Sequence, residues 1–274
     1  MRWRVLSTVG LWVGIIAIIF TTGVTGGVLL ISALALLTQF EIYRLLARTG
    51  GRPCRFTGLA IGAMLLLAPH FLAGSTVWVC DGGILFLLGT AIFLLLALQT
   101  GRSESIETVF VPSLLGLFLG PYLLHFLILP ATQLGTPGLA FGLWIIATAK
   151  FSDVGALLVG LKWGRHPFSP LSPKKTWEGI AGGVATGVVV GLLTYMLFAD
   201  QLPAGFSAGK ALLLAVPIVI FAIAGDLLES AMKRRAGVKD SGRLIPGIGG
   251  AFDLSDSLIW SAPIGYVIAF GWLL

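Results

Sequence analysis

The sequence has few charged residues, and this scarcity excludes a water-soluble protein. Only 11% of its 274 residues are Asp, Glu, Lys or Arg, whereas a soluble domain usually carries about a quarter. Hydrophobic residues make up 57% of the chain, and the mean hydropathy is +0.97. No stretch is long enough and polar enough to form a separate soluble domain. The composition therefore predicts an all-α fold, a polytopic membrane helix bundle.

Cysteine is equally scarce. Cys54 and Cys80 lie in different predicted loops without the spacing of metal ligands, so neither a disulfide framework nor a zinc site is indicated. The net charge of +6 could suggest nucleic acid, but in a membrane protein it usually reflects topology and anionic head groups. No nucleic-acid partner is expected. Met1–Phe20 resembles a signal peptide, but a second apolar run follows a weak cleavage site, so we expect a retained helix.

The apolar runs, separated by Gly, Pro and charged residues, predict about nine membrane spans. The boundary between the first two is the least distinct, because Thr21–Gly27 could be a turn or part of one kinked helix. The predicted spans are Val5–Phe20, Val28–Leu46, Thr57–Leu72, Ile84–Leu98, Val109–Leu129, Leu139–Leu161, Ile180–Phe198, Ala211–Leu228 and Leu258–Leu274.

The distribution of basic residues supports this count. Of the 18 Lys and Arg residues, all but Lys150 and Lys210 lie at the amino terminus or in alternate loops. Such alternation is the positive-inside pattern, and it predicts nine spans with a cytoplasmic amino terminus. An eight-span arrangement would place Arg2 and Arg4 outside. The basic residues that follow the pattern are Arg2, Arg4, Arg44, Arg48, Arg52, Arg55, Arg102, Lys162, Arg165, Lys174, Lys175, Lys233, Arg234, Arg235, Lys239 and Arg243.

The polar residues divide the chain into two regions. Residues 1–136 read as amino-terminal membrane helices. Residues 137–274 read as a carboxy-terminal catalytic membrane region, because its cytoplasmic loops 162–179 and 229–257 carry dense clusters of Ser, Pro, Gly, Lys and Asp. We therefore expect the chemistry at the cytoplasmic end of this second region.

Acidic residues within apolar segments are energetically costly and usually functional. Lys150 and Asp153 lie three residues apart and thus on one helix face, although such a pair could also serve helix packing alone. Asp226 begins a polar stripe that continues through Glu229, Ser230 and Lys233. A helix end that emerges into water would explain Lys233, but it explains Asp226 poorly because a long apolar run precedes that residue.

A second pair of acids follows the Gly-rich turn Pro246–Gly250. Asp253 and Asp256 are three residues apart, so both carboxylates can point the same way. Together with Asp226 they offer three hard oxygen ligands at one membrane interface. Mg²⁺ bound to phosphate oxygens needs ligands of this kind. We therefore predict a Mg²⁺ site formed by Asp226, Asp253 and Asp256.

The loop 162–179 contains a candidate phosphate site. Ser172, Lys174, Lys175 and Thr176 precede a predicted helix start at which Thr176 is suited to be the N-cap. Hydroxyls, ammonium groups and free backbone N–H groups would bind phosphate there. A loop that merely follows the positive-inside rule would explain the lysines but not the compact Ser-Pro-Lys-Lys-Thr-Trp-Glu-Gly string. None of these motifs is a Walker loop or a dinucleotide fingerprint.

At these residues the sequence resembles the phosphatidate cytidylyltransferases, also called CDP-diacylglycerol synthases. The resemblance is close over Lys150–Ser257, and Glu41-Ile42-Tyr43 is a fainter match near the start. Two positions depart from the family pattern: Ile248 stands where His is usual, and Leu254 where Arg is usual. The carboxy-terminal signature is matched by Ser230, Lys233, Arg234, Lys239, Asp240, Pro246, Gly247, Gly249, Gly250, Asp253 and Asp256; upstream, Ser152, Asp153, Gly155, Ala156, Gly160, the Ser172–Gly179 string, Gly225, Asp226 and Glu229 also match.

The resemblance implies that CTP and phosphatidic acid form CDP-diacylglycerol and pyrophosphate, with Mg²⁺ and a plausible K⁺ partner ion. It places the enzyme in membrane lipid, in the bacterial inner membrane with the active site facing the cytoplasm, and leaves a homodimer open. Asp226 and Asp253 would bind metal, Asp256 would be a third ligand or would support the ligands from behind, and Lys175 would be catalytic beside them. The substrate-binding residues implied are Ser172, Lys174, Lys175, Thr176, Asp153, Ser230, Lys233, Arg234, Lys239 and Arg243.

Two other functions stay open at this point. A CTP-dependent polyprenol or phytol kinase shares the nucleotide and the membrane, but would lack the full carboxy-terminal signature. A transporter could also carry buried Asp and Lys. Transporters typically show internal repeats with broken helices, and the two halves of this sequence show no such repeat.

Overall fold

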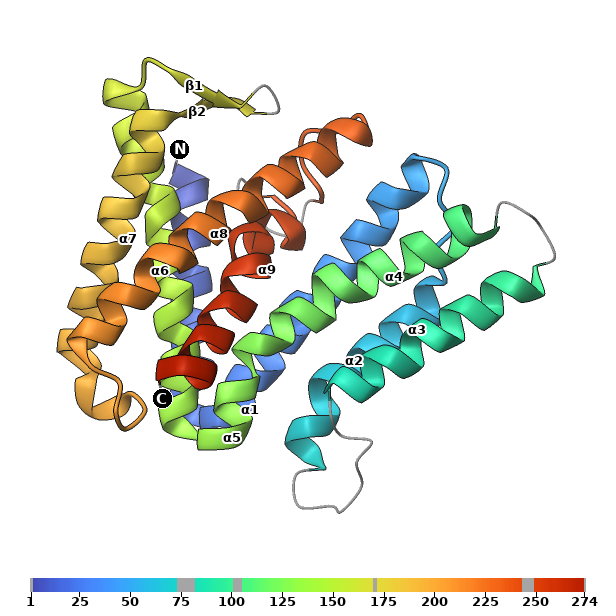
Figure 1. The fold of residues 1–274 in the computed structure, drawn as a ribbon, viewed down its shortest axis with the longest axis horizontal. Coiled ribbons are helices and arrows are strands. Elements are labelled where there is room, and N and C mark those ends of the chain that lie inside the picture. The colour runs from blue at the N-terminus through green and yellow to red at the C-terminus, as the bar shows by residue number, and fades with distance from the viewer. Residues whose placement is uncertain (1, 73–81, 101–104, 170–171, 243–248, 274) are drawn as a thin grey trace. The chain divides into compact units, whose positions relative to one another are not determined.

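The computed structural model describes residues 2–72, 82–100, 105–169, 172–242 and 249–273. In this part of the chain the fold is helical apart from one short hairpin (Figure 1). This confirms the predicted all-α class. The elements are α1 (Arg2–Arg48), α2 (Arg55–Phe71), α3 (Gly82–Gln99), η2 (Ile106–Phe110), α4 (Val111–Leu117), η3 (Phe118–Tyr122), η4 (His125–Leu127), α5 (Leu129–Leu134), α6 (Thr136–Trp163), β1 (Pro167–Ser169), β2 (Ser172–Thr176), α7 (Trp177–Phe198), η5 (Ala199–Gln201), α8 (Ala208–Arg235), α9 (Ala251–Ile268) and η6 (Ala269–Leu273).

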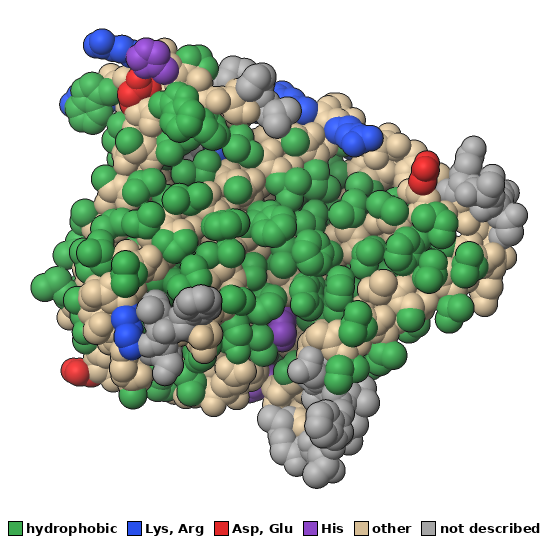
Figure 2. All heavy atoms as spheres, in the orientation of Figure 1, with side chains coloured by type: hydrophobic (Ala, Val, Ile, Leu, Met, Phe, Trp, Pro, Cys, Tyr) green, Lys and Arg blue, Asp and Glu red, His purple; other side chains and the backbone are tan. Residues whose placement is uncertain are grey.

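Six helices in the described ranges are long and apolar enough to cross a membrane, as expected of an integral membrane protein. Apolar side chains cover most of the face seen in Figure 2, and charged ones lie at its margins. The shorter helix α2 is also apolar. The total of nine spans and their orientation stay predictions. The six helices are Ala17–Arg48, Gly82–Gln99, Ile106–Leu134, Thr136–Trp163, Trp177–Gln201 and Ala208–Arg235.

The first two predicted spans are two helical segments that follow one another within α1. α1 runs from Arg2 to Arg48 and is interrupted only at Gly23, whose φ of 59° and ψ of −134° are not helical. Glycine adopts a positive φ without a steric penalty, whereas other residues rarely do. The structure therefore shows two helical segments that meet at a kink at Gly23, within the range Thr21–Gly27.

The chain forms two compact units, each built from segments that are distant in sequence. The first unit contains Met1–Ile128 and Met232–Ser255, and the second contains Leu129–Ala231 and Asp256–Leu274. Helices α8 and α9 thus contribute residues to both units. The sequence-based division at residue 136 stays a prediction.

The first unit is held together by a buried polar network as well as by apolar packing. The hydroxyl of Tyr43 on α1 donates to the carbonyl of Ser113 on α4, at 3.0 Å. Gln39 Nε2 donates to the Tyr43 hydroxyl at 3.0 Å and to the Gly58 carbonyl of α2 at 2.9 Å. Buried polar groups need such partners, so this network fixes how α1, α2 and α4 pack.

In the second unit, glycines allow α6 and α7 to approach closely. Gly179, Gly183, Gly187 and Gly191 are buried at every fourth position of α7. A Cβ atom at Gly183 would lie 3.0 Å from the Ser152 carbonyl oxygen of α6. Stripes of small residues at this spacing permit close packing of membrane helices. The close packing of α6 against α7 therefore fixes both ends of the β1–β2 hairpin that joins them.

Candidate active site

Three carboxylates meet in the second unit. Asp226 and Glu229 extend from α8 and Asp256 from α9, and their ligand oxygens lie within 4.8 Å of one another. Glu229 is almost completely buried, with 2% of its surface exposed. Hard carboxylate oxygens are the protein ligands that Mg²⁺ prefers. The residues present therefore fit a Mg²⁺ ion, and we call this group the acid cluster.

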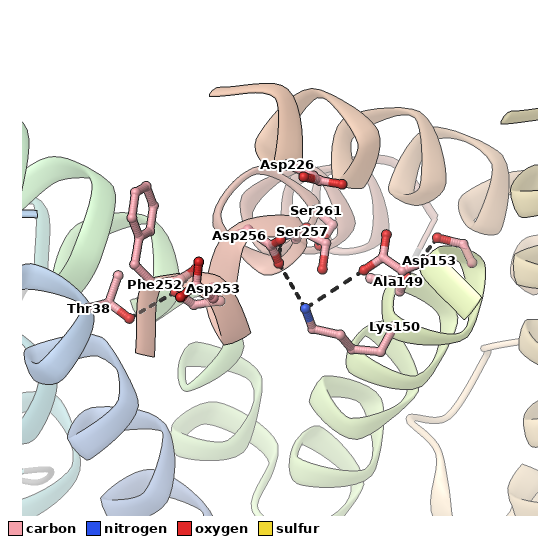
Figure 3. A network of polar contacts seen from close by, with 12 residues as sticks. Thr38, Ala149, Lys150, Asp153, Asp226, Phe252, Asp253, Asp256, Ser257 and Ser261 are labelled. Atoms are coloured by element: carbon pink, nitrogen blue, oxygen red, sulfur yellow. Dashed lines mark hydrogen bonds and ion pairs between the residues drawn. The ribbon is translucent and has the colours of Figure 1, made fainter. Parts of the chain in front are cut away.

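Two lysines compensate part of this negative charge, and Figure 3 shows one of them, Lys150, beside Asp256 and Asp153. Lys150 Nζ lies 2.9 Å from Asp256 Oδ1 and 3.8 Å from Asp153 Oδ2, which confirms that Lys150 and Asp153 share one face of α6. Lys175 forms an ion pair with Asp226. The four carboxylates and two ammonium groups carry a formal charge of 2 − 4 = −2 when all are ionised. A divalent cation would balance this charge.

The hairpin directs only one of its two adjacent lysines to the acid cluster. β1 and β2 pair antiparallel, with Ser169 opposite Ser172 and Pro167 opposite Thr176. Successive side chains of a strand point to opposite faces. Lys175 accordingly contacts Asp226, whereas Lys174 is exposed.

The start of α7 fixes the end of β2. Thr176 is the N-cap of this helix, and its hydroxyl oxygen accepts a hydrogen bond from the backbone N–H of Gly179 at 3.1 Å. The predicted cap is therefore confirmed. The cap fixes Thr176, and with it the adjacent Lys175, to the first turn of α7.

A second contact closes the base of the hairpin. Glu178 Oε1 lies 2.6 Å from His166 Nδ1, and Glu178 Oε2 accepts hydrogen bonds from the backbone N–H groups of Arg165 and His166 at 3.1 and 3.3 Å. The N–H of Trp177 donates to the carbonyl of His166 at 3.0 Å. These contacts join the chain that enters the hairpin to the helix that leaves it.

Asp253 has a different environment, described within the first unit. Its Oδ1 accepts a hydrogen bond from Lys233 Nζ at 2.7 Å. Its Oδ2 accepts hydrogen bonds from the backbone N–H groups of Ser241 and Gly250, at 3.1 and 2.7 Å, and lies 2.9 Å from the Ser241 hydroxyl oxygen. The predicted role of Asp253 as a metal ligand stays a prediction. Among the described residues, the third acid beside Asp226 and Asp256 is Glu229.

The remaining predicted site residues lie outside these contacts. Ser172 on β2 and Ser230 on α8 are half-buried, and Arg234 and Lys239 are exposed. Arg243, like the departing residue Ile248, lies outside the described ranges. Their predicted contacts with substrate stay predictions.

Two acids were not predicted as site residues. Glu229 carried a signal in the sequence, because it lies three residues after Asp226 on the polar stripe of α8. Glu41 had only a weak signal in the sequence, because it is one acid in an apolar helix far from the carboxy-terminal signature. In the structure Glu41 accepts hydrogen bonds from residues 200 and 211 positions further along the chain.

Comparison with known proteins adds independent evidence. The sequence model of the cytidylyltransferase family matches residues 2–271. The chain is similar to a phosphatidate cytidylyltransferase of Synechocystis sp., with 34% identity over 96% of this chain and 94% of that protein. A relative of the same name from Staphylococcus saprophyticus is 33% identical over 75% of each chain. A third, from Mycobacterium bovis, is 40% identical over 43% of this chain, and the match spans 37% of that protein's length.

Proposed function

Because the chain belongs to the cytidylyltransferase family, we propose that it transfers the cytidylyl group of CTP to phosphatidic acid. The products are CDP-diacylglycerol and pyrophosphate. The observation that carries this proposal is the acid cluster of Asp226, Glu229 and Asp256, with Lys175 and Lys150 paired to it. Carboxylates that can hold Mg²⁺, next to cations that can bind phosphate, are what a nucleoside triphosphate requires.

In the proposed reaction, a phosphate oxygen of phosphatidic acid attacks the α-phosphorus of CTP. The bond from the α-phosphorus to the oxygen bridging the β-phosphorus breaks, and pyrophosphate leaves. A phosphate monoester is already anionic at neutral pH, so the chain need not supply a strong general base. Its task is to position the two substrates and to stabilise charge.

Residues of the β1–β2 hairpin and of helices α8 and α9 divide this task. Asp226, Glu229 and Asp256 would hold Mg²⁺, which supplies Lewis-acid polarisation and a template for the phosphates when bound. Lys175, held beside Asp226 by the hairpin, would bind a phosphate oxygen of CTP.

Contacts with the remaining phosphates are assigned to other polar residues by their place in the signature. The exposed residues Arg234 and Lys239 are suited to pyrophosphate or the lipid head group. The group assigned to these contacts is Ser172, Lys174, Thr176, Ser230, Lys233, Arg234, Lys239 and Arg243.

The proposal includes a location. CTP is a cytoplasmic nucleotide, and the basic residues of the two motif loops follow the positive-inside pattern. We therefore place the site at the cytoplasmic face of a bacterial inner membrane, where phosphatidic acid reaches it from the lipid. K⁺ as a partner ion and a homodimer remain expectations of the same proposal.

The experiment is a reconstituted assay with the purified full-length chain, phosphatidic acid, labelled CTP and Mg²⁺. Label in the lipid fraction together with equimolar pyrophosphate is the expected result. A polyprenol or phytol kinase would instead release CDP and phosphorylate an added alcohol, and a transporter would form neither product. Absence of labelled liponucleotide under conditions in which a bacterial homologue is active would overturn the proposal.

A further inference from the structure

Glu41 is a buried acid that the proposed reaction does not use. It lies on α1, outside the carboxy-terminal signature, and only 6% of its surface is exposed. A carboxylate at this depth is costly unless hydrogen bonds compensate for its lost hydration. Its partners therefore indicate what it does.

Among the described residues, the hydrogen-bond donors to Glu41 lie on either side of the Gly-rich turn. Glu41 Oε2 accepts a hydrogen bond from the Ser241 hydroxyl at 2.6 Å and from the backbone N–H of Phe252 at 2.9 Å. The α-carbons of Gly242 and Gly250 are so close that a Cβ atom on either would collide with the Glu41 carboxylate. Two glycines of this region are thus explained by their packing against Glu41.

A second contact lies one helical turn away. The hydroxyls of Thr38 on α1 and Ser255 on α9 are 2.8 Å apart, and both residues are fully buried. Because Thr38 and Glu41 are three residues apart, they share one face of α1. That face holds the first turn of α9 at two points.

The chain of contacts from Glu41 reaches predicted site residues. The Ser241 hydroxyl that donates to Glu41 also lies 2.9 Å from Asp253 Oδ2. The other oxygen of Asp253 accepts a hydrogen bond from Lys233. Asp253 also accepts from the Gly250 N–H, three residues before it, as in a capping box. Displacing Glu41 would therefore move Ser241, and with it Asp253 and Lys233.

We propose that Glu41 is a positioning residue for cytidylyl transfer, which holds Asp253 and Lys233 in place through Ser241 and the first turn of α9. This inference rests on the proposed function, because that proposal assigns Lys233 to a substrate phosphate and Asp253 accepts the hydrogen bond that holds Lys233. It assigns to the amino-terminal helix α1 a part of the catalytic apparatus. A buried acid that served stability alone would change the amount of folded protein but not the turnover of each folded molecule.

The first test measures kcat and both KM values, per folded molecule, for Glu41→Gln, Glu41→Ala and Ser241→Ala. Glu107→Gln is the matched control, because Glu107 is an exposed acid of the same unit. We expect kcat to fall by about tenfold or more for Glu41→Ala, with a smaller change in the KM for phosphatidic acid. Glu107→Gln should stay within about twofold of wild type. A kcat per folded molecule that is unchanged in all Glu41 variants would overturn the proposal.

A double-mutant cycle tests the route through Ser241. If Glu41 acts through that hydroxyl, Glu41→Gln should lower kcat clearly less in the Ser241→Ala background than in wild type. Fully multiplicative effects would contradict this route. Both substitutions are small and retain most of the packing, so the cycle remains informative even where Glu41→Ala does not fold.

Hydrogen exchange separates this inference from the proposed function. The Phe252 N–H should exchange faster in Glu41→Gln and Glu41→Ala than in wild type or Glu107→Gln, because its acceptor is weakened or lost. If the Glu41 variants exchange faster but the wild-type protein forms no liponucleotide, the proposed reaction is refuted while the anchoring contact stands. Unchanged exchange in both Glu41 variants would refute the anchoring contact itself.

Discussion

The two units each contain a group of acids, and the groups differ in what surrounds them. The acid cluster of the second unit is paired mainly with lysine side chains, Lys150 and Lys175. In the first unit, Glu41 and Asp253 accept hydrogen bonds from backbone N–H groups, and the buried Ser241 hydroxyl lies between them. Asp253 also accepts a hydrogen bond from Lys233. Lysine side chains can reorient on their flexible stems, whereas backbone amides cannot move without the chain. The first arrangement suits the binding of ions and phosphates, and the second suits the fixing of loops.

The largest effect is expected from Asp226→Asn in the acid cluster. The substitution keeps the size of the side chain but removes a metal-binding charge, so turnover should fall by about a hundredfold or more. Mn²⁺ binding, followed by electron paramagnetic resonance, should weaken in parallel. Glu229→Gln should weaken Mn²⁺ binding too, whereas Asp200→Asn, at an exposed acid of the same unit, should not.

The same measurements on Asp253→Asn test whether the two groups of acids act separately. We expect this variant to lose turnover but to bind Mn²⁺ better than Asp226→Asn does, because the Asp253 oxygens already accept several hydrogen bonds. Equal loss of Mn²⁺ binding in both variants would show that Asp253 is a principal ligand and that the two groups act as one.

Gly250→Ala tests how rigidly the acids of the first unit hold the chain. The added Cβ would collide with the Glu41 carboxylate and the Ser241 hydroxyl, and overpacking of this kind costs about 1–3 kcal/mol. The midpoint of thermal unfolding should therefore fall by several degrees. Gly209→Ala is the control, since nothing lies within 4 Å of a Cβ at that position. Equal midpoints for the two variants would show that Glu41 and Ser241 can move away from the added Cβ at little cost in stability.

The two lysines of β2 should differ although they are adjacent. Lys175→Gln removes the partner of Asp226 and should lower kcat by about tenfold. Lys174 is exposed, so Lys174→Gln should mainly raise the KM for the lipid, and that change should fade at high salt as surface charges are screened. Measuring kcat and both KM values at low and high salt distinguishes the two. Equal effects would contradict the alternation of the hairpin.

The smallest effect is expected at the base of the hairpin. His166→Ala removes the side-chain contact with Glu178 but leaves the hydrogen bonds from the backbone N–H groups of Arg165 and His166. Exposed pairs contribute little, so the KM for CTP should rise by about twofold and kcat should hold. Glu178→Ala removes all three contacts and should have the larger effect. A tenfold loss of kcat in His166→Ala would mean that His166 itself contacts substrate.

The local features of this fold could be predicted from the sequence. Hydropathy indicated the apolar helices, the spacing of Lys150 and Asp153 placed them on one face, and Thr176 was recognised as a cap. Each of these depends on a few neighbouring residues. Whether the chain turns or kinks at Gly23 was left open, because glycine permits both.

The grouping of the acids could not be predicted, because it depends on how distant helices pack. Spacing alone allows Asp253 and Asp256 to point the same way, but the position of α9 against its neighbours decides which acid meets Asp226. The contact of Lys150 with Asp256 joins residues 106 positions apart, and that of Glu41 with Phe252 joins residues 211 apart. No local pattern encodes such pairs.

The separation between Glu41 and its partners has a consequence for biosynthesis. Glu41 is translated 200 residues before Ser241, which corresponds to about 10–40 s at 5–20 residues per second. During this interval α1 carries an acid whose final hydrogen-bond donors do not yet exist, and an unpaired carboxylate is costly within lipid. α1 can therefore reach its final depth and packing only late in synthesis. A ribosome stalled before residue 241 should leave Glu41 accessible to water, and release of the chain beyond residue 252 should bury it.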